Sequence, residues 1–183
     1  SPSTLRRFER LGVRYVRNFH DGVGLSWQST FAVRTREALA EKCRRSRIRL
    51  EWIGGRPRTS QDRHALARHP LTDGLSWFNQ AHHFSFHTLP TYAREAFMEQ
   101  YGPSDLPRQS YFGDGTPIPL DVIEEIEHAY ELERVEFDWQ RGDLLMIDNM
   151  STAHARTPFE GERLIALTMA DLHAPCPSSP GVA

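Results

Sequence analysis

The sequence predicts a domain of mixed secondary structure, in which helices interrupt the middle of the chain and strands dominate its end. Asp121–Leu132 carries apolar residues at helical spacing and is the clearest predicted helix. Leu144–Ile147 and Leu164–Met169 are short apolar runs, bounded by Gly-Asp or by Pro and Gly, as is typical of strands. This order fits a mainly β fold with helical insertions.

The earlier elements follow from apolar spacing and from capping residues. Gly12 ends the first apolar stripe, and Thr35 has the hydroxyl of a helix N-cap, with Glu37 in the first turn. We therefore expect a short helix with Leu5, Phe8 and Leu11 on one face, a strand over Val13–Phe19, a helix from Thr35 to about Arg45, a strand over Ile48–Ile53, an aromatic strand over Leu75–Phe86, a helix over Tyr92–Tyr101, and a long loop through Pro103, Pro107 and Gly113–Gly115.

Composition limits the class of protein. A chain of 183 residues can form one domain, which we place at residues 1–174, followed by a loose tail over 175–183. The net charge of −2 gives no field that would favour nucleic acid or a membrane surface as partner. Only two cysteines, Cys43 and Cys176, are present, and no apolar run approaches the roughly 20 residues of a membrane span. We expect a soluble cytoplasmic protein; a homo-oligomer is left open.

The polar segment between the two final apolar runs holds metal-binding and anion-binding side chains. It contains His154 and Arg156, and Arg163 opens the second run. A neutral imidazole is a good ligand for a first-row metal, and a guanidinium suits a carboxylate. In an antiparallel sheet, a histidine leaving one strand and an arginine entering the next can face one cavity. Asp148, which precedes Asn149, is expected to serve a turn instead.

This segment resembles a known family. Trp139–Asp143, Asp148–Met150, Ala153–Phe159 and Gly161–Arg163 resemble the C-terminal motif of the taurine-dioxygenase-like iron(II)/2-oxoglutarate oxygenases, in the branch that includes hydroxylases of amino-acid units in peptide natural-product pathways. Arg14–Phe19, Trp77–Gln80 and Tyr111–Gly115 are similar to other parts of that branch. The resemblance implies a double-stranded β-helix, or jelly roll, with iron(II) and 2-oxoglutarate as cofactors.

The resemblance also implies roles for single residues. His154 would be an iron ligand, and Arg163 would anchor the distal carboxylate of 2-oxoglutarate. Arg156 would be the alternative anchor, or a catalytic group that steers oxygen or substrate near the metal. Asn79 follows an aromatic segment and could point toward substrate, with a structural role as the equal alternative.

The first half of the family's metal-binding set is a His-x-Asp or His-x-Glu motif. No histidine of this chain has a carboxylate two residues later. The family places this motif before the strand that begins near Arg14, so we expect it upstream of residue 1. The jelly roll would then be incomplete at its N-terminus, with these residues as its C-terminal portion.

Two functions compete, with a cupin-like metal-binding protein without 2-oxoglutarate chemistry as a distant third. The first is hydroxylation of an unactivated C–H bond of an amino acid or related small molecule, free or tethered to a carrier protein. The second is a catalytically dead jelly-roll domain that acts as a binding or assembly subunit.

Other interpretations of single residues stay open. Arg163 could form an ion pair with Glu160 or Glu162 at the surface, which would stabilise the fold by about 0–1 kcal/mol. His82, His83 and His87 form a local cluster that could bind a metal.

Overall fold

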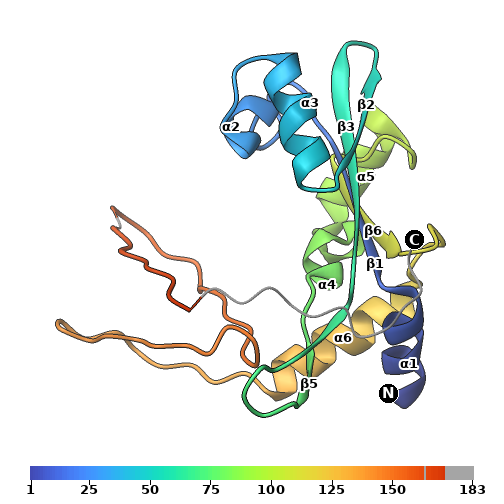
Figure 1. The fold of residues 1–183 in the computed structure, drawn as a ribbon. Helices are drawn as coiled ribbons and strands as arrows, with labels where there is room; N and C mark the ends of the chain where they lie inside the picture. The colour runs from blue at the N-terminus through green and yellow to red at the C-terminus, as the bar shows by residue number, and fades with distance from the viewer. Residues whose placement is uncertain (163, 172–183) are drawn as a thin grey trace. The chain divides into compact units, whose positions relative to one another are not determined.

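The computed structural model describes residues 1–162 and 164–171, and the chain groups into two compact units. Unit 1 comprises Ser1–Ala65 and Asn79–Glu136; unit 2 comprises Leu66–Phe78 and the chain from Phe137 on. Figure 1 follows the chain through both. The prediction of one domain over residues 1–174 stays a prediction, and the tail predicted over 175–183 lies outside the described residues.

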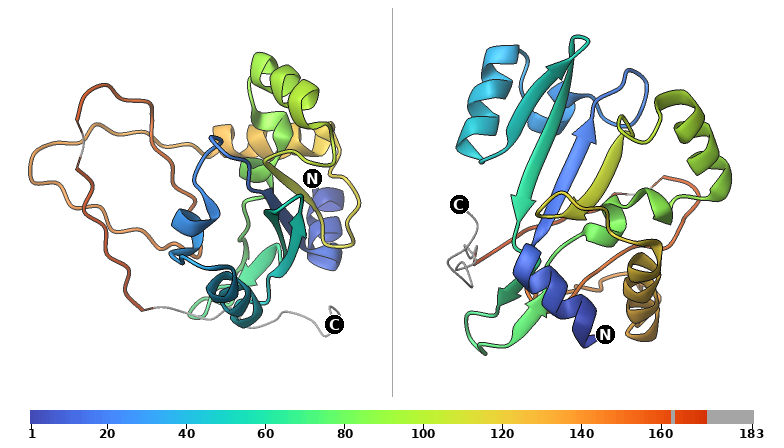
Figure 2. Two further views of the ribbon diagram at one scale, coloured as in Figure 1. Left: turned by 90° about the horizontal axis from the view of Figure 1, so that it is seen from above. Right: turned by 90° about the vertical axis from the view of Figure 1, so that its right-hand side faces the viewer.

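A four-stranded antiparallel sheet organises unit 1. Its strands are β1 (Val13–Asn18), β2 (Arg49–Ile53), β3 (Arg56–Arg63) and β6 (Arg108–Phe112), in the order β2-β3-β1-β6. The strands lie side by side in the right-hand view of Figure 2. β1 is central, with Val16 opposite Ser60 on one side and Gln109 on the other. The strands predicted near residues 13–19 and 48–53 are confirmed.

Two strands of this sheet, β3 and β6, were not predicted from the sequence. Gly54 and Gly55 follow the predicted strand directly, and both have positive φ and form a two-residue hairpin turn. This turn places Ile53 opposite Arg56 and starts β3 at once. β6 lies inside the region expected to be a long loop. Neither strand has an apolar alternation, so their pairing with β1, and not their own composition, defines them.

The predicted helices form, and their ends have identifiable caps. α1 (Pro2–Leu11) ends at Gly12, whose φ is 69°, and α3 (Arg36–Arg45) begins after Thr35, whose hydroxyl accepts a hydrogen bond from the Ala38 backbone N–H at 3.2 Å. Other helices of this unit are α2 (Trp27–Phe31), α5 (Thr91–Tyr101) and α6 (Leu120–Leu132). In Figure 1, α2 and α3 lie together beside the β2–β3 hairpin.

The aromatic strand predicted over Leu75–Phe86 is wrong beyond its first residues. Only β5 (Leu75–Trp77) is a strand; α4 (Ala81–Phe84) and the 3-10 helix η1 (Phe86–Thr88) follow. Ala81 and Phe84 are both buried and lie three residues apart, one helical turn. The Phe84 ring packs edge-on against Tyr15 of β1, with ring centroids 4.8 Å apart. Burial against the sheet therefore selects a helical turn here.

The core of unit 1 lies between the sheet and its helices. The Phe8 ring of α1 packs against Phe112 of β6 at 4.9 Å between centroids. Its best-buried large side chains, each with at most 1% of its surface exposed, are Phe8, Val13, Leu39, Cys43, Phe112 and Ile123. Burying an apolar side chain of this size stabilises the fold by about 1.5–3 kcal/mol. Elements from both ends of unit 1 are thus fixed to the same sheet.

Unit 2 has one regular feature among the described residues. β4 (Leu66–Arg68) pairs with β5 in an antiparallel hairpin, closed by a hydrogen bond from the His69 N–H to the Gly74 carbonyl at 2.9 Å. Residues 137–162 and 164–171 contain neither helix nor strand. The strands predicted over Leu144–Ile147 and Leu164–Met169 are therefore wrong for this structure.

The physical reason for this correction is the absence of backbone partners. A strand is stable only when a neighbour satisfies its N–H and C=O groups, and no ladder pairs with these segments in the described part of the chain. Three of their apolar side chains are consequently exposed to solvent: Leu144, Met146 and Leu164 are each more than 90% exposed. The described residues form antiparallel sheets and helices, and the jelly-roll topology itself stays a prediction.

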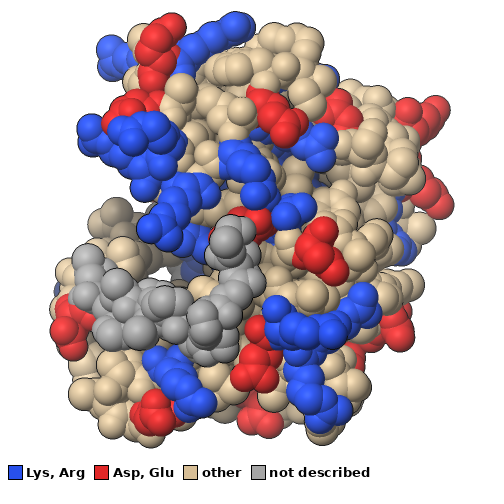
Figure 3. All heavy atoms as spheres, turned by 45° about the vertical axis from the view of Figure 1, so that its right-hand side comes forward, with Lys and Arg blue, Asp and Glu red and all other residues tan. Residues whose placement is uncertain are grey.

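The surface carries both signs of charge. Figure 3 shows basic and acidic side chains interspersed on one face, in keeping with the net charge of −2. Within residues 1–162 and 164–171, no helix has the length and apolar character that crossing a bilayer requires.

A carboxylate shared by two arginines ties three strands together. Arg14 Nε of β1 donates to Asp62 Oδ1 of β3 at 2.6 Å, and Arg49 Nη2 of β2 donates to both Asp62 oxygens at 2.9 Å. Arg14 also donates to the Gly113 carbonyl, at 2.6 Å. Burial alone would raise the pKa of Asp62, but the hydrogen bonds from the arginines outweigh burial and lower it.

We expect Asp62→Asn to lower the free energy of unfolding by about 1–2 kcal/mol at pH 7, because charge-assisted hydrogen bonds to both arginines are lost. A carboxylate with a depressed pKa stabilises the fold above its unfolded pKa of about 3.9, and this contribution disappears as pH falls through the folded pKa. Urea unfolding from pH 7 downward should therefore show the two proteins converging below about pH 4. Exposed Asp138→Asn serves as control; pH profiles that stay parallel would contradict the role of Asp62.

Candidate functional site

The residues that the sequence singled out for metal and cosubstrate binding belong to the final segment. His154 and Arg156 are exposed and lie in irregular backbone of unit 2. The strand end predicted for His154 is not formed, because Leu144–Ile147 is not a strand here. Arg163 lies outside the described residues. The assignments of His154 to iron, and of Arg156 and Arg163 to 2-oxoglutarate, therefore stay predictions.

Asp148 organises the turn that leads into this segment. Its Oδ1 accepts from the Met150 N–H at 2.9 Å, its Oδ2 accepts from the Ser151 hydroxyl at 2.6 Å, and its carbonyl accepts from the Thr152 N–H at 3.0 Å. Hydrogen bonds from Ser151 and from Met150 lower the pKa of Asp148. The turn role expected for Asp148 is confirmed.

His69 is a partner of Asp148 that sequence reasoning missed. Its Nε2 lies 2.9 Å from Asp148 Oδ2, and its Nδ1 accepts from the backbone N–H groups of Leu71 and Thr72, each at 3.2 Å. Because Nδ1 accepts, Nε2 carries the hydrogen and donates to the carboxylate. His69 thus joins the β4–β5 hairpin to the turn before His154. The hairpin itself could have been found from the Thr72-Asp73-Gly74 turn signal, but its partner could not.

Asn79, the predicted substrate residue, has its side-chain amide engaged by backbone. The amide nitrogen donates to the Ala65 carbonyl at 2.8 Å, and Oδ1 accepts from the Ala81 N–H at 2.9 Å. The next residue, Gln80, donates its N–H to the hydroxyl of Tyr15 at 2.8 Å. Burial raises the pKa of Tyr15 to about 12. These contacts fix the entry to α4, and the substrate role of Asn79 stays a prediction.

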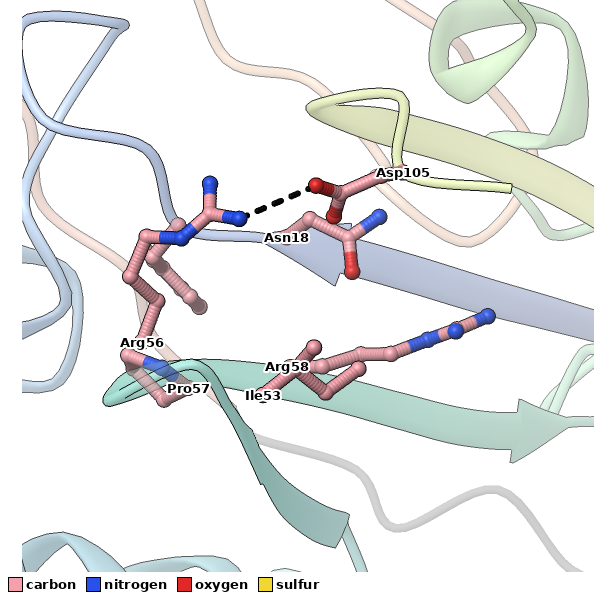
Figure 4. A pocket seen from close by; sticks show the side chains of 7 residues that line it. Asn18, Ile53, Arg56, Pro57, Arg58 and Asp105 are labelled. Atoms are coloured by element: carbon pink, nitrogen blue, oxygen red, sulfur yellow. Dashed lines mark hydrogen bonds and ion pairs between the residues drawn. The ribbon is translucent and has the colours of Figure 1, made fainter. Parts of the chain in front are cut away.

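A polar network closes the C-terminal end of β1. The buried His20 ring stacks on Tyr101, with centroids 4.0 Å apart, and Arg56 Nη2 donates to Asp105 Oδ2 at 3.1 Å. Figure 4 shows Arg56 reaching from the start of β3 to Asp105 beside Asn18. Arg56 also contacts His20 Nδ1. A guanidinium can only donate, so Nδ1 accepts, and Nε2 donates to the Asp105 carbonyl at 2.8 Å.

This network borders a cavity of about 140 Å³. The cavity is lined by the loop from Phe19 to Gln28, including His20, Gly22 and Trp27. Its size suits a few water molecules or a small group and falls below the roughly 300–1,000 Å³ of a typical ligand pocket. Sequence reasoning excluded His20 from a His-x-carboxylate motif, because Asp21 follows it directly. The pairing with Arg56 and Asp105 joins residues 36 and 85 positions away, which no local pattern reveals.

The histidine cluster of the sequence does not assemble a metal centre in the described structure. His82 and His83 lie in α4 and His87 lies in η1. Burial lowers the pKa of all three, and neighbouring arginines lower those of His83 and His87 further. Across residues 1–162 and 164–171, no group of three or more His, Cys, Asp or Glu side chains is placed to hold a metal ion.

Comparison with known proteins gives a consistent assignment. The sequence model of the taurine catabolism dioxygenase TauD, TfdA family matches residues 1–169. The dapdiamide synthesis protein DdaC of Enterobacter agglomerans is 39% identical over 165 residues, which is 90% of this chain and 50% of that protein. A clavaminate synthase-like protein of Arabidopsis thaliana is 27% identical over 177 residues, 92% of this chain and 50% of that protein. The chain thus spans about half the length of these curated relatives.

We expect Asn79→Ala to lower the free energy of unfolding by about 1–3 kcal/mol, because the Ala65 carbonyl and the Ala81 N–H, both in buried residues, lose their hydrogen-bond partner. Chemical denaturation measures this change. The neighbouring Gln80→Ala is the matched control, since the Gln80 side chain is exposed and only its backbone N–H is used. Equal stability of the Asn79 variant and the control would remove the structural role and favour the substrate role.

Proposed function

Because the chain belongs to the taurine catabolism dioxygenase TauD, TfdA family, we propose that the protein is an iron(II)- and 2-oxoglutarate-dependent oxygenase. The match of the family model to residues 1–169 carries this proposal, and the block from His154 to Arg163 lies inside the matched range. The reaction we propose is hydroxylation of an unactivated C–H bond in an amino acid or related small molecule, free or tethered to a carrier protein.

The similarity to a protein named for dapdiamide synthesis supports a role in natural-product biosynthesis. The family also supports the jelly roll as the complete topology, in which the β2-β3-β1-β6 sheet would form one part. We propose a single oxygenase domain, of which residues 1–174 are the C-terminal part, in a cytoplasmic protein. The low cysteine content supports this location.

The side chains in the described structure do not complete an iron site. A facial site of this class needs two histidines and one carboxylate. No such set gathers within the described ranges, where His154 is exposed. By resemblance to the family motif, we assign to this chain one iron ligand, His154. Arg163 is assigned to the distal carboxylate of 2-oxoglutarate because its guanidinium can bind both carboxylate oxygens, with Arg156 as the alternative.

Succinate release from 2-oxoglutarate tests the function directly. The natural protein should convert 2-oxoglutarate to succinate when supplied with iron(II), oxygen and an amino-acid or carrier-tethered substrate. The second candidate is a catalytically dead domain that binds or assembles. It would be supported if a folded protein loaded with iron(II) released no succinate, either with or without substrate.

We expect His154→Ala to weaken iron(II) binding by at least about tenfold, because even the outer partners of metal ligands affect affinity by that much. Anaerobic calorimetric titration of the natural protein measures the affinity. His128→Ala, at an exposed position of α6, is the control. Unchanged iron affinity in the His154 variant would withdraw its assignment as ligand and return attention to His82, His83 and His87.

We expect Arg163→Lys to weaken binding of 2-oxoglutarate about tenfold, since lysine keeps the charge but loses the two-pronged hydrogen bond to a carboxylate. The dissociation constant of 2-oxoglutarate and the KM for it should rise together. The matched variant is Arg156→Lys. An affinity that falls in this variant and not in Arg163→Lys would transfer the anchor to Arg156.

A further inference from the structure

Two arginines of the central sheet face each other, and neither has a carboxylate partner within residues 1–162 and 164–171. Arg17 of β1 lies directly opposite Arg108 of β6 in the antiparallel register. Residues in this relation share one face of the sheet, with Cβ atoms about 4.5–5.5 Å apart, and like charges so placed destabilise the sheet. Both side chains are half-buried, so water screens their repulsion incompletely.

A helix next to the sheet adds two more groups to this position. Arg108 Nη1 lies 3.2 Å from His83 Nε2 of α4, and the guanidinium carbon of Arg17 lies 4.9 Å from the centroid of the Phe84 ring. Because an arginine N–H only donates, His83 accepts through Nε2 and contributes no negative charge. The aromatic ring stabilises the position of Arg17 through a cation–π contact.

The contrast with the opposite face of the sheet is direct. There Arg14 is neutralised by Asp62, at 2.6 Å, which raises the pKa of Arg14. By contrast, burial and then the charge of Arg108 lower the pKa of Arg17, and burial lowers that of Arg108. In the described part of the chain, no ion pair connects either of these two arginines to a carboxylate.

We propose that Arg17, Arg108 and His83, here called the 17/108 site, bind the carboxylate of a small organic acid. Natural sequences avoid such unresolved repulsion except where function requires it. Two guanidinium groups from neighbouring strands can donate to the two oxygens of one carboxylate. A single bound anion would relieve the repulsion that the free protein carries.

Two sources of carboxylate fit this chemistry: an organic substrate and the 2-oxoglutarate of the proposed reaction. The 17/108 site itself does not depend on that reaction, since it needs neither metal nor turnover. Its test can therefore be made in the absence of iron, and its failure would leave the oxygenase proposal standing.

The test is calorimetric titration of the metal-free natural protein with acetate, succinate and 2-oxoglutarate, at an ionic strength held constant with sodium chloride. We expect Arg17→Gln and Arg108→Gln each to weaken carboxylate binding at least tenfold. Arg58→Gln is the matched control: Arg58 is half-buried in β3 opposite Asn18, so it faces the other side of the sheet. Its variant should bind as the unmodified protein does.

The Tm of thermal unfolding without ligand is a second measurement. If the arginines were structural, their Gln variants would have a lower Tm than the unmodified protein. Each Gln variant should be at least as stable as the unmodified protein, because removing one charge relieves repulsion, and carboxylate should no longer raise its Tm.

Binding tenfold tighter for 2-oxoglutarate than for succinate would identify the cosubstrate; similar binding of all three acids would identify a substrate carboxylate. Either result would support the site.

Three results would overturn the proposal. The first is unchanged carboxylate binding in both the Arg17 and Arg108 variants. The second is an equal loss in Arg58→Gln, which would indicate unspecific attraction by surface charge. The third is binding of inorganic phosphate that weakens tenfold in Arg17→Gln, while binding of every carboxylate is unchanged in that variant.

Discussion

The pairing of β1 with a strand on each side is the interaction on which the rest of the described structure depends. β1 supplies backbone hydrogen bonds to β3 and β6, two strands whose own sequences do not resemble strands. It also carries Val13 and Tyr15, against which the helices of unit 1 bury their apolar side chains. Because every backbone group of a buried strand needs a partner, the central position of β1 decides where its neighbours must be extended.

The same requirement explains the end of the chain. Leu144–Ile147 and Leu164–Met169 have the composition of buried strands, yet they are irregular and their apolar side chains are exposed. The chain matches about half the length of its curated relatives, and a jelly roll is built from strands that pair across distant parts of the sequence. A strand-forming composition therefore does not suffice to make these segments strands. The regularity of a strand belongs to the pair of strands and not to one segment.

Polar groups in this protein serve two different physical tasks. Asp62, Asp148, His20 and His69 each have at least one polar contact with a residue far away in the sequence, and these contacts join elements together. Arg17 and Arg108 have no carboxylate partner among the described residues, and they hold like charges opposite each other. A satisfied network stabilises a fold, whereas an unsatisfied one is tolerated where a ligand can complete it. This distinction separates the structural polar residues from the candidate binding residues.

The sequence by itself determined the family, the helices with clear caps, and the strand at the centre of the sheet. Thr35, Gly12 and the stripe of Asp121–Leu132 act through neighbours only a few residues away, so local patterns reveal them. The block around His154 was recognisable because its residues are contiguous. The tertiary structure alone decided β3 and β6, the helical turn at Ala81–Phe84, and the partners of His20 and His69. Each of these depends on a contact between distant parts of the chain, and such contacts leave no periodic trace in a single sequence.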